Sequence, residues 1–203
     1  MRFFCSFVAA TLAHLYIAWI HPFGDGNGRT ARLLECAILA HSGVVPWVSS
    51  NLLSDHYNRT RSRYYQRLER ASRESDVHGF ITYSAQGYVD MLREQIDRVQ
   101  VQQRRVAWVN YVHEVMQQTP DGGTQKRQRT VVLSLPTERG VRRAEIRRLT
   151  PELAEMYAGK TDKTLTRDLN RLHELGLIRR QGNLWWSRID LMDAFMPTGR
   201  TSL

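Results

Sequence analysis

Residues 21–32 of the chain read HPFGDGNGRTAR, between an apolar run and a segment with helical periodicity. Three of these residues are glycines at alternate positions, Gly24, Gly26 and Gly28. Such spacing lets the backbone approach a ligand closely and turns several N–H groups toward one point. A helix that starts directly afterwards adds its unpaired N–H groups and the positive end of its dipole. The stretch is therefore predicted to be an anion-binding loop between two helices.

The charged side chains of this loop suit a polyphosphate. Arg29 and Arg32 are three residues apart, which places both guanidinium groups on one helical face. Asp25 would repel phosphate directly, but it is explained if it holds a divalent cation that bridges phosphate oxygens. Imidazole is the side chain that ordinarily titrates near neutrality, so His21 is the candidate general base.

Two common phosphate motifs are excluded. A P-loop has Lys and then Ser or Thr after its last glycine, whereas Arg29 and Thr30 follow Gly28 here. A dinucleotide fingerprint follows a strand, whereas this loop follows a predicted helix.

The loop resembles the signature of Fic-domain proteins, His-Pro-Phe-x-Asp/Glu-Gly-Asn-Gly-Arg-x-x-Arg, at every fixed position. The similarity of the surrounding helices extends this resemblance to roughly residues 8–115. It implies transfer of AMP from ATP to a Ser, Thr or Tyr hydroxyl of a target protein, with Mg²⁺. It also implies that His21 deprotonates the hydroxyl, that Asp25 ligates the metal and that Phe23 is a buried anchor.

The same resemblance assigns the phosphate contacts. Asn27, with the backbone amides of Gly26 and Gly28, would hold the α-phosphate of ATP. Arg29 and Arg32 would hold the outer phosphates.

Two further parts of the family's catalytic domain have no counterpart that we identify. In members of the family, a β-hairpin flap ahead of the motif clamps the target segment, and an inhibitory helix that precedes the motif carries a Ser/Thr-x-x-x-Glu pattern. Only twenty residues precede His21. We expect an N-terminally shortened Fic core, in which nucleotide binding can survive without productive modification of a target.

The apolar run over residues 3–20 is long enough to span a bilayer. It also carries Ser, Thr and His residues, and its predicted packed face comprises Ala9, Ala10, Ala13 and Ile17. We interpret it as a core helix with no membrane association, a secretory signal being the alternative. Cys5 and Cys36 form neither a disulfide framework nor a zinc pattern, so they are expected to be reduced core residues of a cytoplasmic protein.

The predicted fold class is mainly α, with a helical Fic core followed by a small α+β domain. Helices are expected to end near Ile20 and at Ser42–Gly43, and a long helix is expected from about Ser84 to Gln117 after Asp76 as a capping residue. The segment TPDGGT, residues 119–124, is the strongest signal for a turn or linker in the sequence. The predicted domains are therefore residues 1–118 and 125–203, with a linker at 119–124.

The second domain has the outline of a winged helix-turn-helix. The pattern predicts helices at about 125–135, 142–157 (broken near Pro151) and 161–175, and then strands at 177–180 and 184–188. The intervening Gln181-Gly182-Asn183 is a hairpin signal, and Gly176 is a plausible helix stop.

The third of these helices is the candidate DNA-binding element. Residues 101–203 carry 18 Lys or Arg and 11 acidic residues, a net charge of +7, against +2 for residues 1–100. An anionic partner is thus expected for the second half. Lys163, Thr164, Arg167 and Arg171 are predicted to point outward, as a helix in the major groove requires. A winged helix used for protein docking or dimerisation is the alternative.

Three hypotheses follow for the whole chain. In the first, it is a protein adenylyltransferase that uses ATP and Mg²⁺, with an unidentified target protein. In the second, it is a DNA-binding regulator whose Fic core is inactive. In the third, the loop serves a related transfer from another phosphate donor. A homodimer is one option for its assembly.

Overall fold

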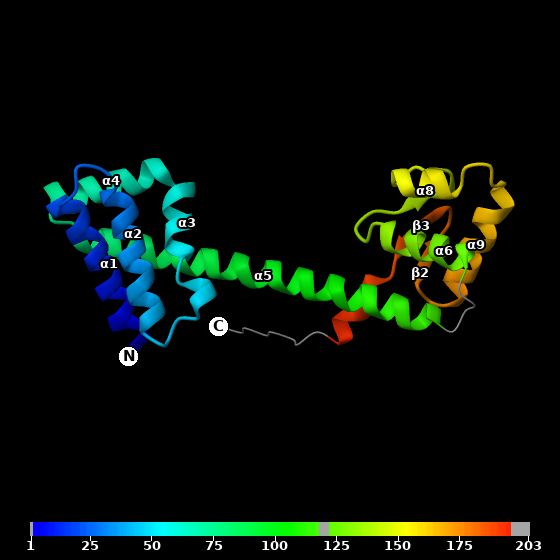
Figure 1. The fold of residues 1–203 in the computed structure, drawn as a ribbon, viewed down its shortest axis with the longest axis horizontal. Coiled ribbons are helices and arrows are strands. Elements are labelled where there is room, and N and C mark those ends of the chain that lie inside the picture. Colours follow the sequence, from blue (N-terminus) through cyan, green and yellow to red (C-terminus); the bar gives the residue numbers. More distant parts are fainter. Residues whose placement is uncertain (1, 118–121, 196–203) are drawn as a thin grey trace. The chain divides into compact units, whose positions relative to one another are not determined.

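The computed structural model describes residues 2–117 and 122–195 (Figure 1). It is mainly helical with a small three-stranded sheet, as the sequence predicts. The chain divides into two compact units, residues 1–98 and 99–203, and each unit has its own hydrophobic core.

The N-terminal unit is helical. Its elements are α1 (Arg2–Ile20), α2 (Asn27–His41), a 3-10 turn (Trp47–Ser49), α3 (Leu52–Arg59), α4 (Arg61–Arg73) and the first part of α5 (Val77–Gln117). The predicted ends of the first two helices are confirmed, since α1 ends at Ile20 and α2 at His41. After α2, the Ser42 amide donates to the Ile38 carbonyl and Gly43 lies at φ +69°. The long helix begins earlier than predicted, since Asp76 caps α5 itself by accepting a hydrogen bond from the Gly79 amide.

Aromatic and aliphatic side chains of all five helices form the core of this unit. The buried members are Phe7, Ala10, Leu15, Leu39, Val45, Leu52, Leu53, Tyr57, Tyr64, Ala71, Phe80, Tyr83 and Tyr88. Their rings pack at centroid distances of 4.8 Å (Tyr57 to Tyr64) to 6.4 Å (Tyr64 to Phe80), within the range of favourable aromatic pairs.

Helix α1 packs by one face. Its buried residues are Phe7, Ala10, Thr11, His14 and Leu15. The predicted packed face was wrong in part, because Ala9 is exposed and Ala13 and Ile17 are only half-buried. The larger Phe7 and Leu15 side chains bury more apolar area and so determine which face turns inward.

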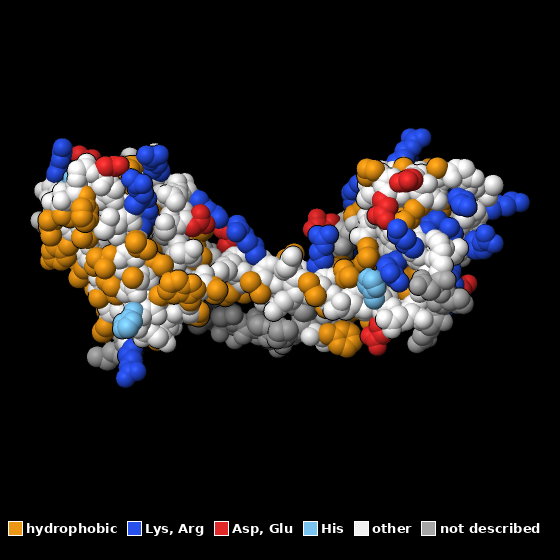
Figure 2. Space-filling view, in the orientation of Figure 1, with side chains coloured by type: hydrophobic (Ala, Val, Ile, Leu, Met, Phe, Trp, Pro, Cys, Tyr) orange, Lys and Arg blue, Asp and Glu red, His pale blue; other side chains and the backbone are white. Residues whose placement is uncertain are grey.

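The outer face of α1 is apolar as well. It carries Phe4, Tyr16 and Ile20, and Figure 2 shows hydrophobic side chains gathered on the surface of the N-terminal unit. By length and composition, α1 is a helix that could cross a membrane, and 28% of its apolar window is buried in this structure.

The C-terminal unit combines short helices with the sheet. Its elements are the remainder of α5, α6 (Gly123–Ser134), β1 (Val141–Arg142), α7 (Arg143–Ile146), α8 (Pro151–Met156), α9 (Asp162–Glu174), β2 (Ile178–Gln181), β3 (Leu184–Ser187) and a 3-10 turn (Ile189–Ala194). The sheet has the order β1-β3-β2 and is antiparallel, with Val141 opposite Trp185 and Ile178 opposite Ser187.

The predicted turn residues stop the elements where expected. Gly176, at φ +71°, ends α9, and the Leu177 amide donates to the Leu172 carbonyl at 3.0 Å, which is a Schellman motif. Gly182, at φ +59°, is the first central residue of the two-residue hairpin loop.

Strand β1 is an element that we did not predict. It takes up Arg142, the first residue of the helix expected at 142–157, because Val141 and Arg142 pair with β3. Two residues are too short for a period-two pattern to be read from sequence. The break predicted near Pro151 is confirmed, since α7 ends at Ile146 and α8 begins at Pro151 with Thr150 as its cap.

The division into compact units falls earlier than the predicted linker. Trp108, Val112 and Met116, in the last part of α5, pack in the core of the C-terminal unit with Leu165, Leu169 and other residues. The compact units therefore divide after Arg98 rather than at residue 118. Residues 119–121 of the predicted linker lie outside the described residues, and Gly123–Thr124 form the first turn of α6.

Candidate functional site

The glycine-rich loop joins α1 to α2, and its backbone bends at two residues. His21 lies at φ +49° and Gly26 at φ +86°, both in the left-handed region. Helix α2 begins at Asn27, and the Thr30 amide donates to the Gly26 carbonyl at 2.9 Å. The loop thus ends at a helix N-terminus, the arrangement that favours bound anions.

Asn27 fastens the loop. Its side chain is buried, and its Oδ1 accepts from the Phe23 amide at 3.0 Å while its Nδ2 donates to the Phe23 carbonyl at 2.5 Å. The same Nδ2 lies 3.2 Å from Nδ1 and 3.1 Å from Nε2 of His21. The Asn27 side-chain amide therefore lies against the His21 ring and can donate a hydrogen bond to one of its nitrogens.

Arg29 and Arg32 lie over the glycine backbone of the loop. A β-carbon at Gly26 would lie 3.6 Å from an Arg29 nitrogen, and one at Gly28 would lie 3.5 Å from an Arg32 nitrogen. Asp25 pairs with Arg29 at 3.0 Å, and both side chains are largely exposed. A guanidinium group therefore lies near each of the two glycines at the uncapped N-terminus of α2, an arrangement that suits an anion with several oxygens.

The structure brings the predicted loop residues together on this turn: His21, Asp25, Gly26, Asn27, Gly28, Arg29 and Arg32. Two expectations about burial were wrong. Phe23 is 48% exposed, because only its backbone is held by Asn27. Cys5 is exposed and Cys36 is half-buried, with its sulfur 3.2 Å from the Ser50 hydroxyl.

The residues suit a metal only in partnership with phosphate. Within 2–117 and 122–195, no group of three or more His, Cys, Asp and Glu side chains could hold a metal ion. Asp25 offers one exposed carboxylate whose Oδ1 accepts from the Gly26 amide. This donor fits Mg²⁺, which binds through one or two carboxylates together with substrate phosphates.

A buried polar network behind the loop was not predicted. His14 Nδ1 lies 3.1 Å from Glu35 Oε2, and His14 Nε2 lies 2.8 Å from the Tyr64 hydroxyl. The Tyr57 hydroxyl donates to Glu35 Oε1 at 3.0 Å and lies 2.9 Å from the Ser84 hydroxyl. The signal in the sequence was Glu35, which falls between Ala31 and Leu39 on the apolar face of α2.

The tyrosines of this network are held as neutral phenols. Burial raises the pKa of Tyr57 well above its ordinary value, and the nearby Glu35 carboxylate raises it further. Burial likewise raises the pKa of Tyr64, while the Arg32 guanidinium beside its hydroxyl acts in the opposite direction.

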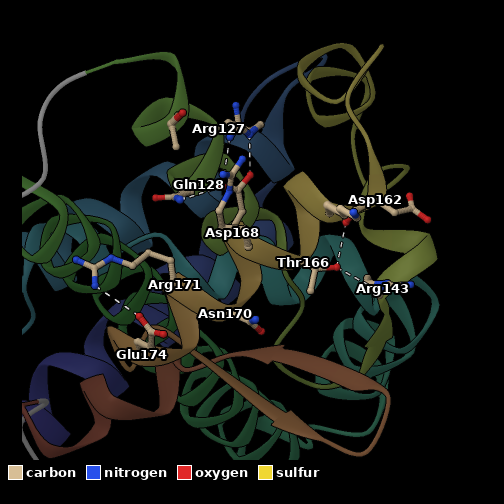
Figure 3. A pocket seen from close by; sticks show the side chains of 12 residues that line it. Arg127, Gln128, Arg143, Asp162, Thr166, Asp168, Asn170, Arg171 and Glu174 are labelled. Carbon is tan, nitrogen blue, oxygen red and sulfur yellow. Dashed lines mark hydrogen bonds and ion pairs between the residues drawn. The ribbon is translucent and has the colours of Figure 1, made fainter.

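The predicted DNA-binding residues lie on α9, in the other unit. Lys163, Arg167 and Arg171 are exposed as expected, whereas Thr164 is half-buried with its hydroxyl 3.5 Å from that of Thr161. Lys163, Arg167 and Arg171 border a cavity of about 890 Å³ that is also lined by Arg127, Arg143 and Asn170 (Figure 3). Arg171 is paired with Glu174 at 3.6 Å, and Asp162 also lines this cavity, so the surface is basic but not uniformly so.

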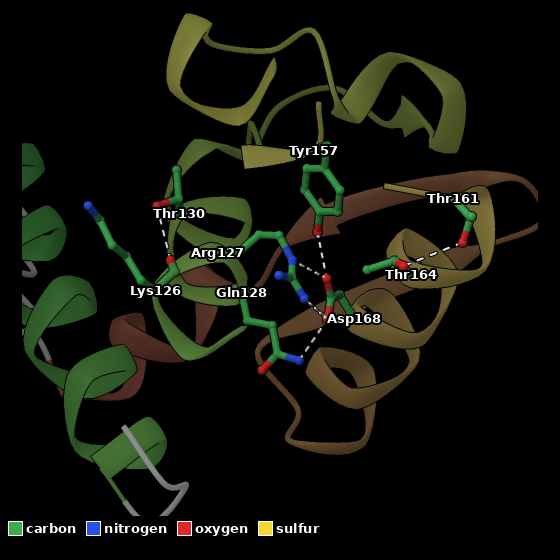
Figure 4. Close-up of polar contacts among 8 residues, drawn as sticks. All are labelled: Lys126, Arg127, Gln128, Thr130, Tyr157, Thr161, Thr164 and Asp168. Atoms are coloured by element: carbon green, nitrogen blue, oxygen red, sulfur yellow. Dashed lines mark hydrogen bonds and ion pairs between the residues drawn. The ribbon is translucent and has the colours of Figure 1, made fainter. Parts of the chain in front are cut away.

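Asp168 fixes α9 against its neighbours (Figure 4). Its buried carboxylate accepts from Arg127 at 2.7 and 3.2 Å, from Gln128 at 2.9 Å and from Tyr157 at 2.9 Å. These contacts join α9 to α6 and to the end of α8, and they leave the opposite face of α9 to solvent.

The loop lies within the part of the chain that is similar to known proteins. The Fic/DOC family model matches residues 4–39. The protein adenylyltransferases Fic of Nematostella vectensis and Drosophila melanogaster are 41% and 40% identical to this chain over 76 residues. This segment is 37% of the chain and only 16% and 14% of those relatives, respectively. What the comparisons identify is a short Fic-like segment that contains the entire glycine-rich loop.

Proposed function

We propose that the N-terminal unit transfers AMP from ATP to a hydroxyl side chain, Ser, Thr or Tyr, of a target protein. The observation that carries the proposal is the complete loop motif at the N-terminus of α2, with His21 beside Asn27 and both arginines over the glycines. The names of the relatives support the class of reaction. Because the matched segment is a small part of those relatives, the activity of this chain needs its own test.

The phosphates of ATP would bind where the positive groups converge. The Gly28 amide would contact the α-phosphate, and the Gly26 amide would do so after exchanging its bond to Asp25 Oδ1 for a phosphate oxygen, with Asn27 holding the loop around it. Arg29 would exchange its partner Asp25 for the outer phosphates, an exchange that costs little since exposed ion pairs contribute about 0–1 kcal/mol. Mg²⁺ held by Asp25 would neutralise charge on the phosphate oxygens.

The chemical step needs one base. The hydroxyl oxygen of the target forms a bond to the α-phosphorus as the bond from that phosphorus to the bridging oxygen of pyrophosphate breaks. The hydroxyl proton passes to His21, and the electron pair of the broken bond leaves with pyrophosphate. Positioning and charge neutralisation supply most of the acceleration in such transfers.

The test is AMP transfer to protein, read by intact mass and with labelled ATP. His21→Ala should lower the rate by about 10²–10⁴-fold while MgATP still binds, because a general base contributes that much. His41→Ala is the matched control, since His41 is an exposed histidine at the other end of α2. A donor screen in the same assay separates ATP from other phosphate donors, and failure of the loop to bind any Mg-nucleotide would refute the proposal.

A second candidate function rests on α9. The order α6, β1, α7–α8, α9 and the β2–β3 hairpin suits a winged helix, and the exposed Lys163, Arg167 and Arg171 suit a DNA surface. In this proposal the chain binds DNA and the loop is inactive.

DNA binding by this unit should weaken with salt and on Arg167→Ala, as expected for phosphate contacts. Glu174→Gln, which removes an acid from the same face, should strengthen it. No affinity for DNA at low salt would exclude this function.

A further inference from the structure

We propose that His56 is an acid-sensitive contact between α3 and α5, and that protonation of its imidazole loosens the N-terminal unit. The inference rests on a buried ring nitrogen that has no hydrogen-bond partner among the described residues. It is independent of the proposed function, because it concerns the packing of this unit and none of the residues of the glycine-rich loop.

The imidazole of His56 is enclosed by aromatic rings and by helix backbone. The residue is 9% exposed, and its ring centroid lies 4.7 Å from that of Tyr83 on α5 and 5.9 Å from that of Tyr57 on α3. A β-carbon at Gly87 would lie 2.2 Å from Nε2 and from Cδ2, so this edge of the ring lies directly against the backbone of α5. The ring therefore joins α3 to α5 by packing, and its Nε2 is buried without a partner in the described part of the chain.

The two protonation states of the ring differ in how well they suit this site. A neutral imidazole has one nitrogen without a proton, so Nε2 can face Gly87 as an unprotonated atom. In an imidazolium both nitrogens carry protons, and the Nε2–H would then be a buried donor with no acceptor. Removing the positive charge from water adds a further cost. The folded unit thus favours the neutral ring.

Two carboxylates and one guanidinium act on His56 through space. Asp55 of α3 and Asp90 of α5 raise its pKa, whereas Arg63 of α4 lowers it. The Arg63 guanidinium lies 5.7 Å from the centroid of the Tyr83 ring, against which the imidazole also packs. A protonated imidazole would therefore meet a like charge beside the same aromatic ring.

The carboxylates do not compensate for burial. Both are about half exposed to water, and Asp55 is paired with Arg59 at 2.8 Å. Arg59 also pairs with Glu94 of α5 at 2.7 Å. Desolvation by burial is the largest influence on the imidazole, and the pKa of His56 is lowered from its ordinary value of 6.5.

Acid should therefore weaken the N-terminal unit. The unfolded chain takes up a proton on this histidine near pH 6.5, whereas the folded unit does so only at a lower pH. Between these two values the unfolded state binds more protons, so stability falls as the pH falls. For one proton, the equilibrium constant of unfolding rises by up to about tenfold for each pH unit in this window.

Titration of the histidine ring protons by NMR tests the inference in the unaltered protein. The signal of His56, identified by its loss in His56→Gln, should titrate below pH 6.5 in the folded protein. In denaturant the same residue should titrate at about pH 6.5, the ordinary value. A His56 imidazole that titrates in the folded protein at or above its value in denaturant would overturn the inference.

Chemical denaturation between about pH 7.5 and about pH 5, followed by the NMR signals of the N-terminal unit, gives the second measurement. The wild type should lose stability on acidification, and this loss should be smaller in His56→Gln and in His56→Phe, neither of which can take up the proton. His78→Gln is the matched control, because it removes an exposed histidine of the same unit and leaves the His56 ring in place. It should keep the acid-dependent loss of the wild type. An equal loss in the wild type and in both His56 variants would overturn the inference.

Discussion

His14 and Glu35 are ionisable residues on largely apolar helical faces, and their side chains pair with each other in the core. Glu35 lies between the buried Ala31 and Leu39 on α2, but its place in the sequence does not reveal which residue pairs with it. The partner is 21 residues away on another helix, and its identity depends on packing rather than on local pattern. The loop was easier to predict, since His21 to Arg32 are contiguous and their chemistry is local. Burial of Phe23 was not predictable in the same way, because it depends on what covers the loop.

Gly87 is a residue whose importance is visible only in the structure. A β-carbon there would lie 2.2 Å from two ring atoms of His56, which is itself buried. Gly87→Ala gains about 1 kcal/mol in helix propensity, but overpacking costs about 1–3 kcal/mol. We expect a net destabilisation in chemical denaturation of the N-terminal unit.

The control for this prediction is the same substitution in a His56→Ala background. With the ring removed, Gly87→Ala should become neutral or stabilising. Equal destabilisation in both backgrounds would show that the clash is not the cause.

Among the elements, helix ends and the hairpin followed from sequence, and the short strand did not. Gly176 and Gly182 adopt positive φ, so their positions in the chain fix where α9 and β2 end. Strand β1 exists because β3 offers it hydrogen bonds, which is a tertiary effect. The outward positions of Lys163, Arg167 and Arg171 on α9 were predicted from sequence, whereas the role of Asp168 in setting that face was not.

Asp168→Ala should destabilise the C-terminal unit by about 3–5 kcal/mol, because it leaves the Arg127 charge buried and unpaired. Denaturation followed by the fluorescence of the buried Trp185 measures this change. Asp162→Ala is the comparison on the same helix: its pair with Arg147 is 77% exposed on the aspartate side, so the loss should stay below about 1 kcal/mol. Equal effects of the two substitutions would contradict the account of Asp168.

At the scale of the molecule, residues 2–117 and 122–195 contain two hydrophobic cores that share no residue. Composition and turn residues predicted two domains, but they placed the boundary about twenty residues later than the compact units have it. Trp108, Val112 and Met116 of α5 are apolar, so from the sequence they could pack in either core. Only packing shows that they belong with the C-terminal core.

Separate cores predict separate unfolding transitions in calorimetry. Phe80→Ala should lower the stability of one transition and Leu169→Ala that of the other, each by about 2–5 kcal/mol, since both side chains are fully buried. A single transition that both substitutions shift alike would show that the units unfold together.

The left-handed backbone at His21 lowers the stability of the fold at the position where the proposed function needs an imidazole. A non-glycine residue is strained at φ +49°, and glycine would occupy the turn more comfortably. Selection for heat resistance alone would therefore tend to replace His21 with glycine, and the variants recovered would be more stable proteins without the imidazole that we propose as the base.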